Sequence, residues 1–507
     1  MANILIYTEG TLGDHLPYIA LGQALSARGH RVRFAINKAM HKYAQLSGLE
    51  AVALTDTERG PEEARKNAWA WDHWHQVDLD SCYRAEPLAQ DHYVTRAREL
   101  IELCHDADLL IATSIRTLGY VAHAATGIPW LTASMNPYSF WQPVSLEERE
   151  AWLQGRLQEY ENLKGLLAYT FAQLGLDQPV PNFSKAWLYA RHVILASSTH
   201  FGRPDLEQLQ PYSSLDMTGF WFYQDPGWEN WEPSDELRRF CDRRPMVLSF
   251  SSQPLADPRS VLATHVEAAQ HLGLPLLIQR GWAGFTEEDL PPDSDPSQLL
   301  FTDFLPHDWL FSHASCAIQH GGIGSIARAL RNGCPLLIEP YGNDQLYNAS
   351  RVVQLEMGAA MHPFKMTTDG LVEVLSDKVL SSDCRKRVQA LGATLRIEDG
   401  LGSACRAVET YLDRVTSGKE ESTAQAVPLL PNRYAPPLDA PMARPEAVAT
   451  ARPSPQPIPK MVHQTWRDAN IPPVYTRFRD GWQRHHPDWN HYLWTDTDNR
   501  EFLRRHY

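Results

Sequence analysis

Short apolar segments alternate with segments of helical apolar spacing, and this alternation is the feature that most limits the fold. Ile4–Tyr7 is apolar, Leu16–Ala27 has helical spacing, and Val32–Ile36 is apolar again after Gly29, a residue that favours a helix end. A strand, a helix and a second strand in this order predict a parallel sheet. Further strands are predicted at Leu109–Ala112, Trp130–Ala133 and Val193–Ala196. These segments predict a first doubly wound α/β domain.

A second series of the same kind follows a passage rich in proline and tryptophan at residues 219–233. Its predicted strands are Met246–Phe250, Pro275–Gln279, Ala317–His320 and Pro335–Glu339, and its last predicted helix is Ser403–Val415. We therefore predict two Rossmann-like domains, residues 1–235 and 236–417, that face each other across a cleft. The length of 507 residues, at about 150 per domain, leaves room for a third unit.

The remainder of the chain divides into a linker and a small tail. Residues 424–459 contain ten prolines and few large apolar side chains, so they cannot bury enough surface to offset their ordering entropy. Residues 418–459 are therefore predicted to be an extended linker. Residues 460–507 regain strand and helix signals, but so short a segment is too small for an independent core. We interpret it as a partial α/β domain.

Charge and cysteine content narrow the partners and the compartment. A net charge of −14 argues against a nucleic-acid partner, because such binding needs clustered Lys and Arg. Seven cysteines, without a CxxC pair, fit neither a disulfide framework nor a zinc site and predict a reducing cytoplasm. No window approaches about 20 apolar residues and no signal peptide is recognised, so we expect no transmembrane segment. Peripheral membrane contact stays open.

The strongest chemical signal is the glycine-rich run from His320 to Ser325, which lies between an apolar strand and a helix. Such a turn presents backbone amides and the positive end of the helix dipole to a phosphate. His320 and Ser325 would add side-chain donors. The alternative is a tight turn whose glycines only solve a packing problem.

The surrounding stretch, Phe304 to Val352, resembles the donor-binding signature of family 1 glycosyltransferases of the antibiotic, macrolide and sterol branch, which have the GT-B fold. The resemblance implies that the histidine contacts a diphosphate, that the glycines line it, that an Asp-Gln pair binds sugar hydroxyls, and that the start of the stretch frames the base. At these positions the chain has Phe304, Leu305, His320, Gly322, Gly324, Ser325, Asp344 and Gln345.

Gly10–Ala35 is similar to the start of the acceptor domain in the same branch. The resemblance implies that Asp14 is the general base, at the carboxyl end of a parallel strand where ligands bind. The alternative is that Asp14 is the N-cap of the following helix, and the two roles can coexist. His15 departs from the family pattern. We interpret it first as a surface residue, then as a partner of Asp14, then as the base itself.

A second departure is the run Ser249-Phe250-Ser251-Ser252, where the family has Gly-Phe-Gly-Ser near the phosphate. Ser252 matches the family serine and is assigned to donor binding. Ser251 replaces a glycine and adds a side chain where the backbone should approach closely. Trp282, in a turn that resembles the Gly-Trp turn of the family, is expected to line the cleft.

Acceptor choice is expected to come from aromatic residues of the first domain. The candidates are Trp74, within Ala68–Gln76, together with Tyr138, Phe140 and Trp141. A further aromatic cluster is Phe220–Tyr223. Apolar pockets with a few polar groups suit a lipophilic or aromatic acceptor. Core packing explains such clusters equally well.

Ile458–Asn499 resembles the opening of family 32 glycosyltransferases, mannosyltransferase-like enzymes of the GT-A type with a DXD motif. In that family the metal-binding motif lies well downstream of this segment, so Asp496-Thr497-Asp498 is not assigned to a metal. The resemblance therefore implies one active site in this chain.

Taken together, the family 1 resemblance implies an inverting hexosyltransferase that moves sugar from a UDP- or TDP-sugar to a hydroxyl of a small lipophilic acceptor, such as a natural product, sterol or lipid. The helix end replaces the cation that other nucleotide-sugar enzymes need, so we expect no metal and no cofactor beyond the nucleotide sugar. Alternatives are a catalytically idle nucleotide-sugar-binding helper, which Ser251 favours, and a nucleotide-sugar 2-epimerase. NAD binding is excluded because the first loop lacks GxGxxG.

Overall fold

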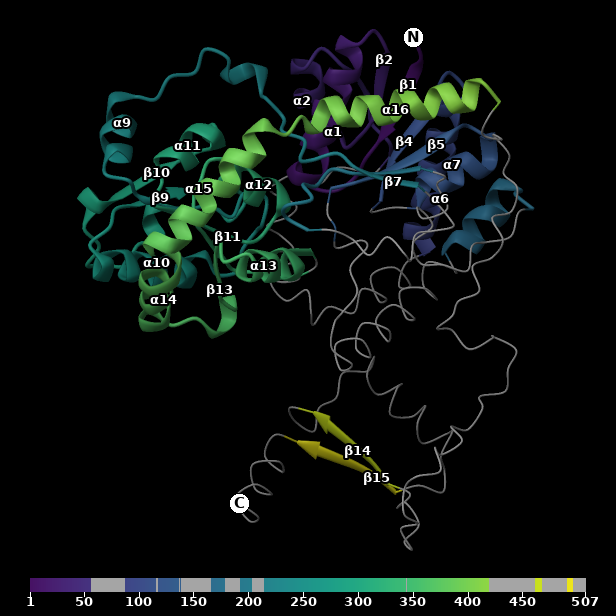
Figure 1. Cartoon of the computed structure of the whole chain (residues 1–507). Helices are drawn as coiled ribbons and strands as arrows, with labels where there is room; N and C mark the ends of the chain where they lie inside the picture. The colour runs from purple at the N-terminus through teal and green to yellow at the C-terminus, as the bar shows by residue number, and fades with distance from the viewer. Residues whose placement is uncertain are drawn as a thin grey trace, which may run out of the picture. The chain divides into compact units, whose positions relative to one another are not determined.

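The computed structural model describes residues 1–55, 87–114, 117–135, 137, 166–177, 192–202, 214–342, 344–418, 461–466 and 490–495. The chain divides into two compact units, Met1–Arg433 and Tyr434–Tyr507. The first unit holds two parallel sheets, each flanked by helices (Figure 1). This arrangement confirms the predicted pair of doubly wound domains.

In the described part of the chain the first sheet has seven parallel strands in the order β3-β2-β1-β4-β5-β6-β7. The strands are β1 (Asn3–Tyr7), β2 (Arg31–Ala35), β3 (Glu50–Val52), β4 (Leu109–Thr113), β5 (Trp130–Ser134), β6 (His192–Leu195) and β7 (Ser214–Met217). The helices are α1 (Leu12–Ala27), α2 (His41–Leu46), α6 (Pro87–Cys104) and α7 (Leu118–Thr126). The predicted strands are confirmed, and the edge strands β3 and β7 are additions.

The second sheet has six described strands, all parallel, in the order β10-β9-β8-β11-β12-β13. They are β8 (Met246–Leu248), β9 (Leu276–Gln279), β10 (Leu299–Thr302), β11 (Cys316–Gln319), β12 (Leu336–Ile338) and β13 (Gly358–Ala360). The helices are α9 (Asp235–Asp242), α10 (Pro258–Leu272), α11 (His307–His313), α12 (Ile323–Arg331), α13 (Asp344–Gln354), α14 (Thr368–Val374), α15 (Ser382–Ile397) and α16 (Gly400–Thr416). The four predicted strands are confirmed.

The chain crosses between the two domains twice, and the two crossings touch. In the first crossing, Trp221 and Tyr223 pack into the apolar cluster of the first domain, whereas Phe220 packs into that of the second. Gly219 has a φ of +91°, and an added Cβ there would lie 3.3 Å from the Cα of Gly400 in the second crossing. An added Cβ at Gly400 would lie 2.2 Å from the carbonyl oxygen of Phe220. Glycine is therefore needed where the two segments meet.

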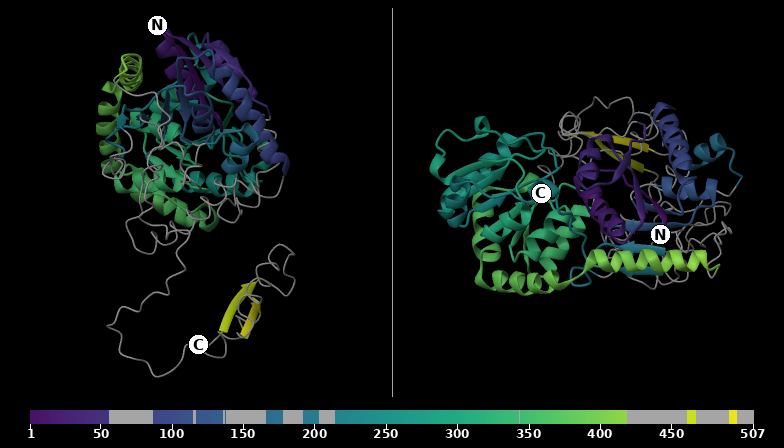
Figure 2. Two further views of the ribbon diagram at one scale, coloured as in Figure 1. Left: turned by 90° about the vertical axis from the view of Figure 1, so that its right-hand side faces the viewer. Right: turned by 90° about the horizontal axis from the view of Figure 1, so that it is seen from above.

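The second crossing carries α16 back onto the first domain, where it lies alongside α1 (Figures 1 and 2). Val408 and Leu412 belong to the same buried cluster as the strands of the first sheet. The Tyr411 hydroxyl donates to the carbonyl of Trp130 at 3.2 Å, and Arg28, the residue after α1, pairs with Glu409 at 2.6 Å. Sequence order assigns this helix to the second domain, but its apolar face packs on the first.

Helix α1 begins four residues earlier than the sequence predicts. Thr11 precedes its first residue and donates its backbone N–H to the Asp14 carboxylate at 2.7 Å, as in a capping box. Asp14 therefore lies in the first helical turn, not in a loop.

A buried ion pair joins α10 to the end of β12. The Nε2 of His265 lies 2.6 Å from Oε1 of Glu339, and both side chains are 1% exposed. The other ring nitrogen of His265, Nδ1, lies 2.7 Å from the carbonyl oxygen of Val261. Burial alone would lower the pKa of His265, but the charge and hydrogen bond of Glu339, with the Val261 carbonyl, raise it above its usual value.

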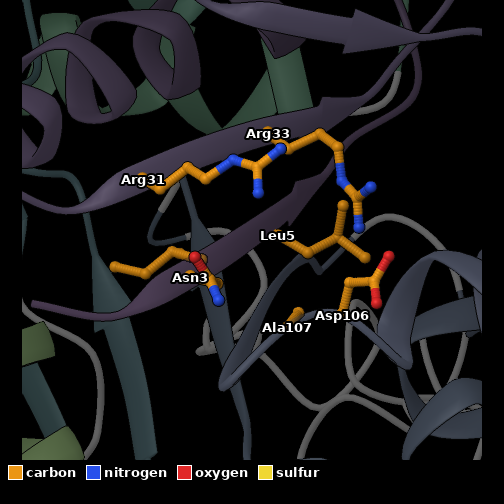
Figure 3. A pocket seen from close by; sticks show the side chains of 7 residues that line it. Asn3, Leu5, Arg31, Arg33, Asp106 and Ala107 are labelled. Atoms are coloured by element: carbon orange, nitrogen blue, oxygen red, sulfur yellow. The ribbon is translucent and has the colours of Figure 1, made fainter.

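A small pocket lies away from the predicted site. It is at the amino-terminal edge of the first sheet and is lined by Arg31 and Arg33 of β2 and by Asp106 and Ala107 before β4 (Figure 3). Parallel strands direct their site-forming loops to the opposite, carboxyl edge.

Within the described segments, no helix has both the length and the apolar character needed to cross a membrane. The six described cysteines are buried and unpaired, and the cytoplasmic location stays a prediction.

The second unit contains two described strands, β14 (Met461–Trp466) and β15 (Asn490–Thr495), which pair in parallel. The sequence predicts both strands and helices in this tail, and the described residues contain the two strands. Asp496-Thr497-Asp498 lies outside the described residues.

We predict that His265→Leu alone lowers the free energy of unfolding by about 3–5 kcal/mol, because it leaves the Glu339 carboxylate buried without its partner. Replacing both residues with leucine should cost far less. In the wild type, the stabilisation from His265 is fully present below about pH 6.5, its unfolded value, and is lost as pH rises through the raised folded pKa. Urea unfolding of the three proteins across this range measures both effects. If the stability of the double variant fell with pH as that of the wild type does, the pH dependence could not be assigned to His265.

Candidate functional site

The carboxyl edges of the two sheets meet at the loops that follow β1 and β8. The Oγ of Ser252, four residues beyond the end of β8, donates to the Oγ1 of Thr11 at 3.2 Å. Because parallel strands end at one edge, the loops after β9, β11 and β12 come to the same region of the second domain. These loops, with the first turns of the helices that follow them, contain the described site residues that the sequence predicts, apart from Phe304 and Leu305, which follow β10 (Leu299–Thr302).

Asp14 is held by the loop that precedes it. Its Oδ2 accepts from the Thr11 backbone N–H at 2.7 Å and from the Thr11 hydroxyl at 3.2 Å. Its own carbonyl accepts from the Thr8 hydroxyl at 2.8 Å. Gly10 has a φ of +127°, and an added Cβ there would lie 2.2 Å from the same Oδ2. The capping alternative holds in a modified form, because Thr11 is the N-cap and Asp14 is the third residue of the helix.

His15 is fully buried, so the prediction of a surface histidine is wrong. Neither ring nitrogen makes a hydrogen bond of ordinary geometry. Burial lowers the pKa of His15 to about 4, although the Gly10 backbone and the Glu9 carboxylate act in the opposite direction. The imidazole is therefore neutral at neutral pH.

A buried polar cluster lies at the end of β1, next to this loop. The hydroxyl of Tyr7 donates to Oε1 of Glu9 at 2.5 Å, and Arg96 of α6 pairs with the same oxygen at 2.8 Å. Burial and the Glu9 carboxylate raise the pKa of the Tyr7 hydroxyl well above its usual value. No sequence pattern indicates this cluster, because Arg96 lies far from Glu9 along the chain.

The turn from β11 into α12 is built tightly around His320. This histidine is 6% exposed, and burial lowers its pKa to about 4, so it is neutral at neutral pH. Gly321 has a φ of +105°, and an added Cβ there would lie 2.9 Å from Ile338 of β12. An added Cβ at Gly322 would lie 2.7 Å from Nε2 of His320. These two glycines are therefore required by close packing.

The amino end of α12 lies just beyond this packed turn. Gly322 is the N-cap residue and no side chain caps the helix, so its first amides have no partner within the helix. Gly324 is exposed, and an added Cβ there would meet nothing within 4 Å. Packing therefore does not explain Gly324, in contrast to Gly321 and Gly322. Ser325 follows in the same turn and is partly exposed.

The loop between β12 and α13 is joined to the His320 turn. Nδ2 of Asn348 donates to the carbonyl of Gly321 at 2.9 Å and to Oδ2 of Asp344 at 3.0 Å. Oε1 of Gln345 accepts from the backbone N–H of Tyr341 at 2.8 Å. The Gln345 Nε2 group donates to Oε1 of Gln253 at 3.3 Å. The structure thus brings the Asp-Gln pair to the glycine-rich turn.

The loop after β8 contains both serines that replace family glycines. Ser249 is buried and donates to Oε1 of Gln279 at 2.7 Å. Ser251 has a φ of +48°, which side chains other than glycine disfavour. Its carbonyl accepts from the Trp282 backbone N–H at 2.8 Å and lies 2.8 Å from an added Cβ at Gly281. The backbone at Ser251 therefore keeps the conformation that a glycine would favour.

Three predicted wall residues differ in exposure. Trp282 is 5% exposed and belongs to the apolar cluster of the first domain, which includes Leu12 of α1. Phe304 is 36% exposed, and its ring lies 6.2 Å from that of His307. Leu305 is buried in the core of the second domain beside Leu310. Of the Phe304-Leu305 pair, only Phe304 presents its side chain at the surface.

The predicted acceptor residues Trp74, Tyr138, Phe140 and Trp141 lie outside the described residues. The aromatic cluster Phe220–Tyr223 is part of the domain crossing. Its core alternative is therefore confirmed for Phe220, Trp221 and Tyr223, which are 5–6% exposed.

Sequence reasoning missed Gly10, Thr11 and Gln253 at this site. The spacing of Thr11 and Asp14 is that of a capping box, and this signal would have placed Thr11 before the helix. Nothing in the sequence indicates that Gln253 contacts Gln345. In the described part of the chain, no group of three or more His, Cys, Asp or Glu side chains is arranged to hold a metal ion.

A family model described as the erythromycin biosynthesis protein CIII-like C-terminal domain matches residues 289–394, which include the His320 turn and the Asp-Gln pair. A sterol 3-beta-glucosyltransferase of Yarrowia lipolytica is 26% identical over 454 residues, which are 82% of this chain and 30% of that protein. One from Arabidopsis thaliana is 23% identical over 443 residues, 81% of this chain and 68% of that protein. The chain spans just under a third of the length of the Yarrowia relative.

Two solved structures show the same fold. The calicheamicin glycosyltransferase CalG4 has a TM-score of 0.61 and 19% identity, covering 82% of this chain and 99% of that one. The glycosyltransferase VinC, in complex with DTDP, has a TM-score of 0.56 and 18% identity, covering 81% of this chain and all of that one. The chain therefore has the GT-B fold and is similar to family 1 glycosyltransferases over about four fifths of its length. These comparisons give no support to the family 32 resemblance of the tail, which stays a prediction.

Replacing Ser251 and Ser249 separately by glycine tests the backbone account of this loop. Ser251→Gly removes a side chain from a backbone in the left-handed conformation, so it should raise the free energy of unfolding by up to about 1 kcal/mol. The matched variant Ser249→Gly loses a buried hydrogen bond and should lower it by about 1–3 kcal/mol. Thermal or urea unfolding measures both. Destabilisation of similar size in the two variants would show that the side chain of Ser251 stabilises the loop.

Proposed function

We propose that this chain is an inverting glycosyltransferase that moves a hexose from a nucleoside diphosphate sugar to a hydroxyl of a small lipophilic acceptor. The observation that carries the proposal is the uncapped amino end of α12 beside buried His320, in a domain whose Ser252 also contacts the Asp14 loop through Thr11. A helix end of this kind binds a diphosphate through its amides and dipole. The similarity to sterol glucosyltransferases supports glucose as the sugar.

The donor residues divide by what each can contact. Gly322, Gly324 and Ser325 offer amides and a hydroxyl to the diphosphate, and neutral His320 adds one ring N–H as a donor. Asp344 is partly exposed at the start of α13 and accepts hydrogen bonds from sugar hydroxyls. Gln345 already holds the Tyr341 backbone and Gln253, so its main part is to shape the sugar pocket. Phe304 offers a ring to the base.

Asp14 is the general base of the proposed reaction. It removes the proton of the acceptor hydroxyl, the hydroxyl oxygen attacks the anomeric carbon, and the bond to the diphosphate breaks in the same step. The negative charge that develops on the leaving diphosphate is stabilised by the α12 amides and His320. One displacement inverts the anomeric configuration. The helix end supplies this stabilisation without a metal, which is why we propose a metal-independent reaction.

The acceptor is proposed to be a sterol or another lipophilic alcohol. The relatives that support this class are named as sterol 3-beta-glucosyltransferases, and structural neighbours include glycosyltransferases of natural products. The first test incubates the protein with UDP-glucose or TDP-glucose and cholesterol, with NAD as a ligand control. Selective thermal stabilisation by one nucleotide diphosphate together with a steryl glucoside product supports the proposal. Stabilisation without any product would favour an idle nucleotide-sugar binder.

Two variants separate binding from chemistry. Asp14→Asn keeps the size of the side chain but removes the base, so turnover should fall by about 10²–10⁴ while nucleotide affinity stays within about twofold. His320→Ala removes a phosphate donor and should weaken both nucleotide binding and turnover. Calorimetric titration with the diphosphate and single-turnover assays measure the two effects. Turnover retained by Asp14→Asn would sink the assignment of the base.

A further inference from the structure

One hydroxyl group connects the two domains at the candidate site. The Oγ1 of Thr11 lies 3.2 Å from the Oγ of Ser252 in the second domain and 3.2 Å from Oδ2 of Asp14 in the first. Thr11 therefore contacts both the proposed base and the donor domain. Ser252 is 8% exposed and Thr11 is partly exposed, so the connection is partly buried.

The donor and acceptor properties of Ser252, Thr11 and Asp14 determine the direction of the hydrogen bonds between them. An ionised carboxylate only accepts, so the Thr11 hydroxyl donates its single proton to Asp14. The remaining lone pairs of Thr11 accept, so Ser252 must be the donor to Thr11. A neutral Asp14 would not require this order. Hydrogen bonds that Thr11 donates to the Asp14 carboxylate stabilise its ionised form, which is the form that a general base needs.

We propose that Thr11 is a positioning residue, which orients Asp14 and ties its orientation to Ser252 of the donor domain. The proposal rests on the proposed glycosyl transfer. The backbone N–H and the hydroxyl of Thr11 both bind Oδ2, which limits rotation of the carboxylate. Gly10 leaves room for that oxygen on the other side, because an added Cβ would lie 2.2 Å from it. The bond from Ser252 adds a second partner to the Thr11 hydroxyl, so the rotation of the group that orients the carboxylate is fixed from both domains.

The hydrogen bond between Ser252 and Thr11 would respond to binding of the donor diphosphate. Ser252 has one hydroxyl proton, which it gives to Thr11 in this structure. A diphosphate that accepts this proton instead would release Thr11 from Ser252 while leaving the Thr11 bond to Asp14 intact. Binding of the donor and setting of the base are thus coupled through one exchange of hydrogen-bond partner.

The test compares Thr11→Val with Thr11→Ser in the full chain. Valine keeps the shape and the backbone N–H but lacks the hydroxyl, so kcat should fall by about 10²-fold or less, in the range of a misplaced reacting group. Nucleoside diphosphate affinity should stay within about twofold. The acid limb of the kcat/KM profile should move to higher pH, because a carboxylate that loses a donor takes up a proton more readily. Thr11→Ser should restore both rate and profile.

Two controls make the result specific. Thr394→Val removes an exposed threonine hydroxyl of α15 that bonds only its own helix, so it should leave rate, affinity and pH profile unchanged. In a Ser252→Ala background, which weakens donor binding by itself, Thr11→Val should lower kcat by a smaller factor than in the wild type. Additive effects of the two substitutions would contradict the coupling through Ser252.

The possible failures are distinguishable. A Thr11→Val protein with wild-type kcat and pH profile would overturn the positioning role and leave the proposed function standing. A loss of rate matched by an equal loss of diphosphate affinity would make Thr11 a donor ligand instead. Wild-type protein that forms no glycoside from either nucleotide sugar would overturn the proposed function, and the positioning role with it.

Discussion

The hydrogen bond between Ser252 and Thr11 marks the place where two parallel sheets direct their loops. In such a sheet every strand ends at the same edge, so the loops that carry chemistry gather there without any need for sequence proximity. Each loop then needs a residue that permits a close approach. Gly10 makes room for the Asp14 carboxylate, and Gly322 makes room for the His320 ring. The positions of the Asp14 and His320 side chains thus depend on glycines in the backbone beside them.

The two domains are held in one unit by the crossings that run between them. Phe220 packs into the second domain while Trp221 packs into the first, so one extended segment anchors both cores. Gly219 and Gly400 allow this segment to touch the return crossing before α16. Because α16 packs on α1, and α1 begins with the Thr11 cap, the return crossing also supports the helix that presents Asp14. The proposed base and donor residues depend on these contacts for their relative placement.

The sequence predicts central strands well and edge strands poorly, for a physical reason. Strands such as β4 and β5 are buried on both faces, so their continuous apolar runs stand out. The edge strand β7, Ser214–Met217, is half exposed and alternates polar with apolar residues over only four positions. Helical spacing likewise identifies α16 but does not tell which sheet it covers. Apart from Ser252 and Trp282, the residues assigned to the donor lie in one continuous stretch, Phe304–Val352, whereas the partners of Asp14 and Gln345 depend on tertiary contacts.

In the proposed reaction, Asp14 and the amino end of α12 act together in a single displacement. The most direct measurement is the anomeric configuration of the glucoside formed from an α-linked nucleotide sugar, read by proton nuclear magnetic resonance. A single displacement gives a β-glucoside with no α product. A glucoside that retains the α configuration would contradict a single displacement with Asp14 as the base, and would require a different arrangement of the reacting groups.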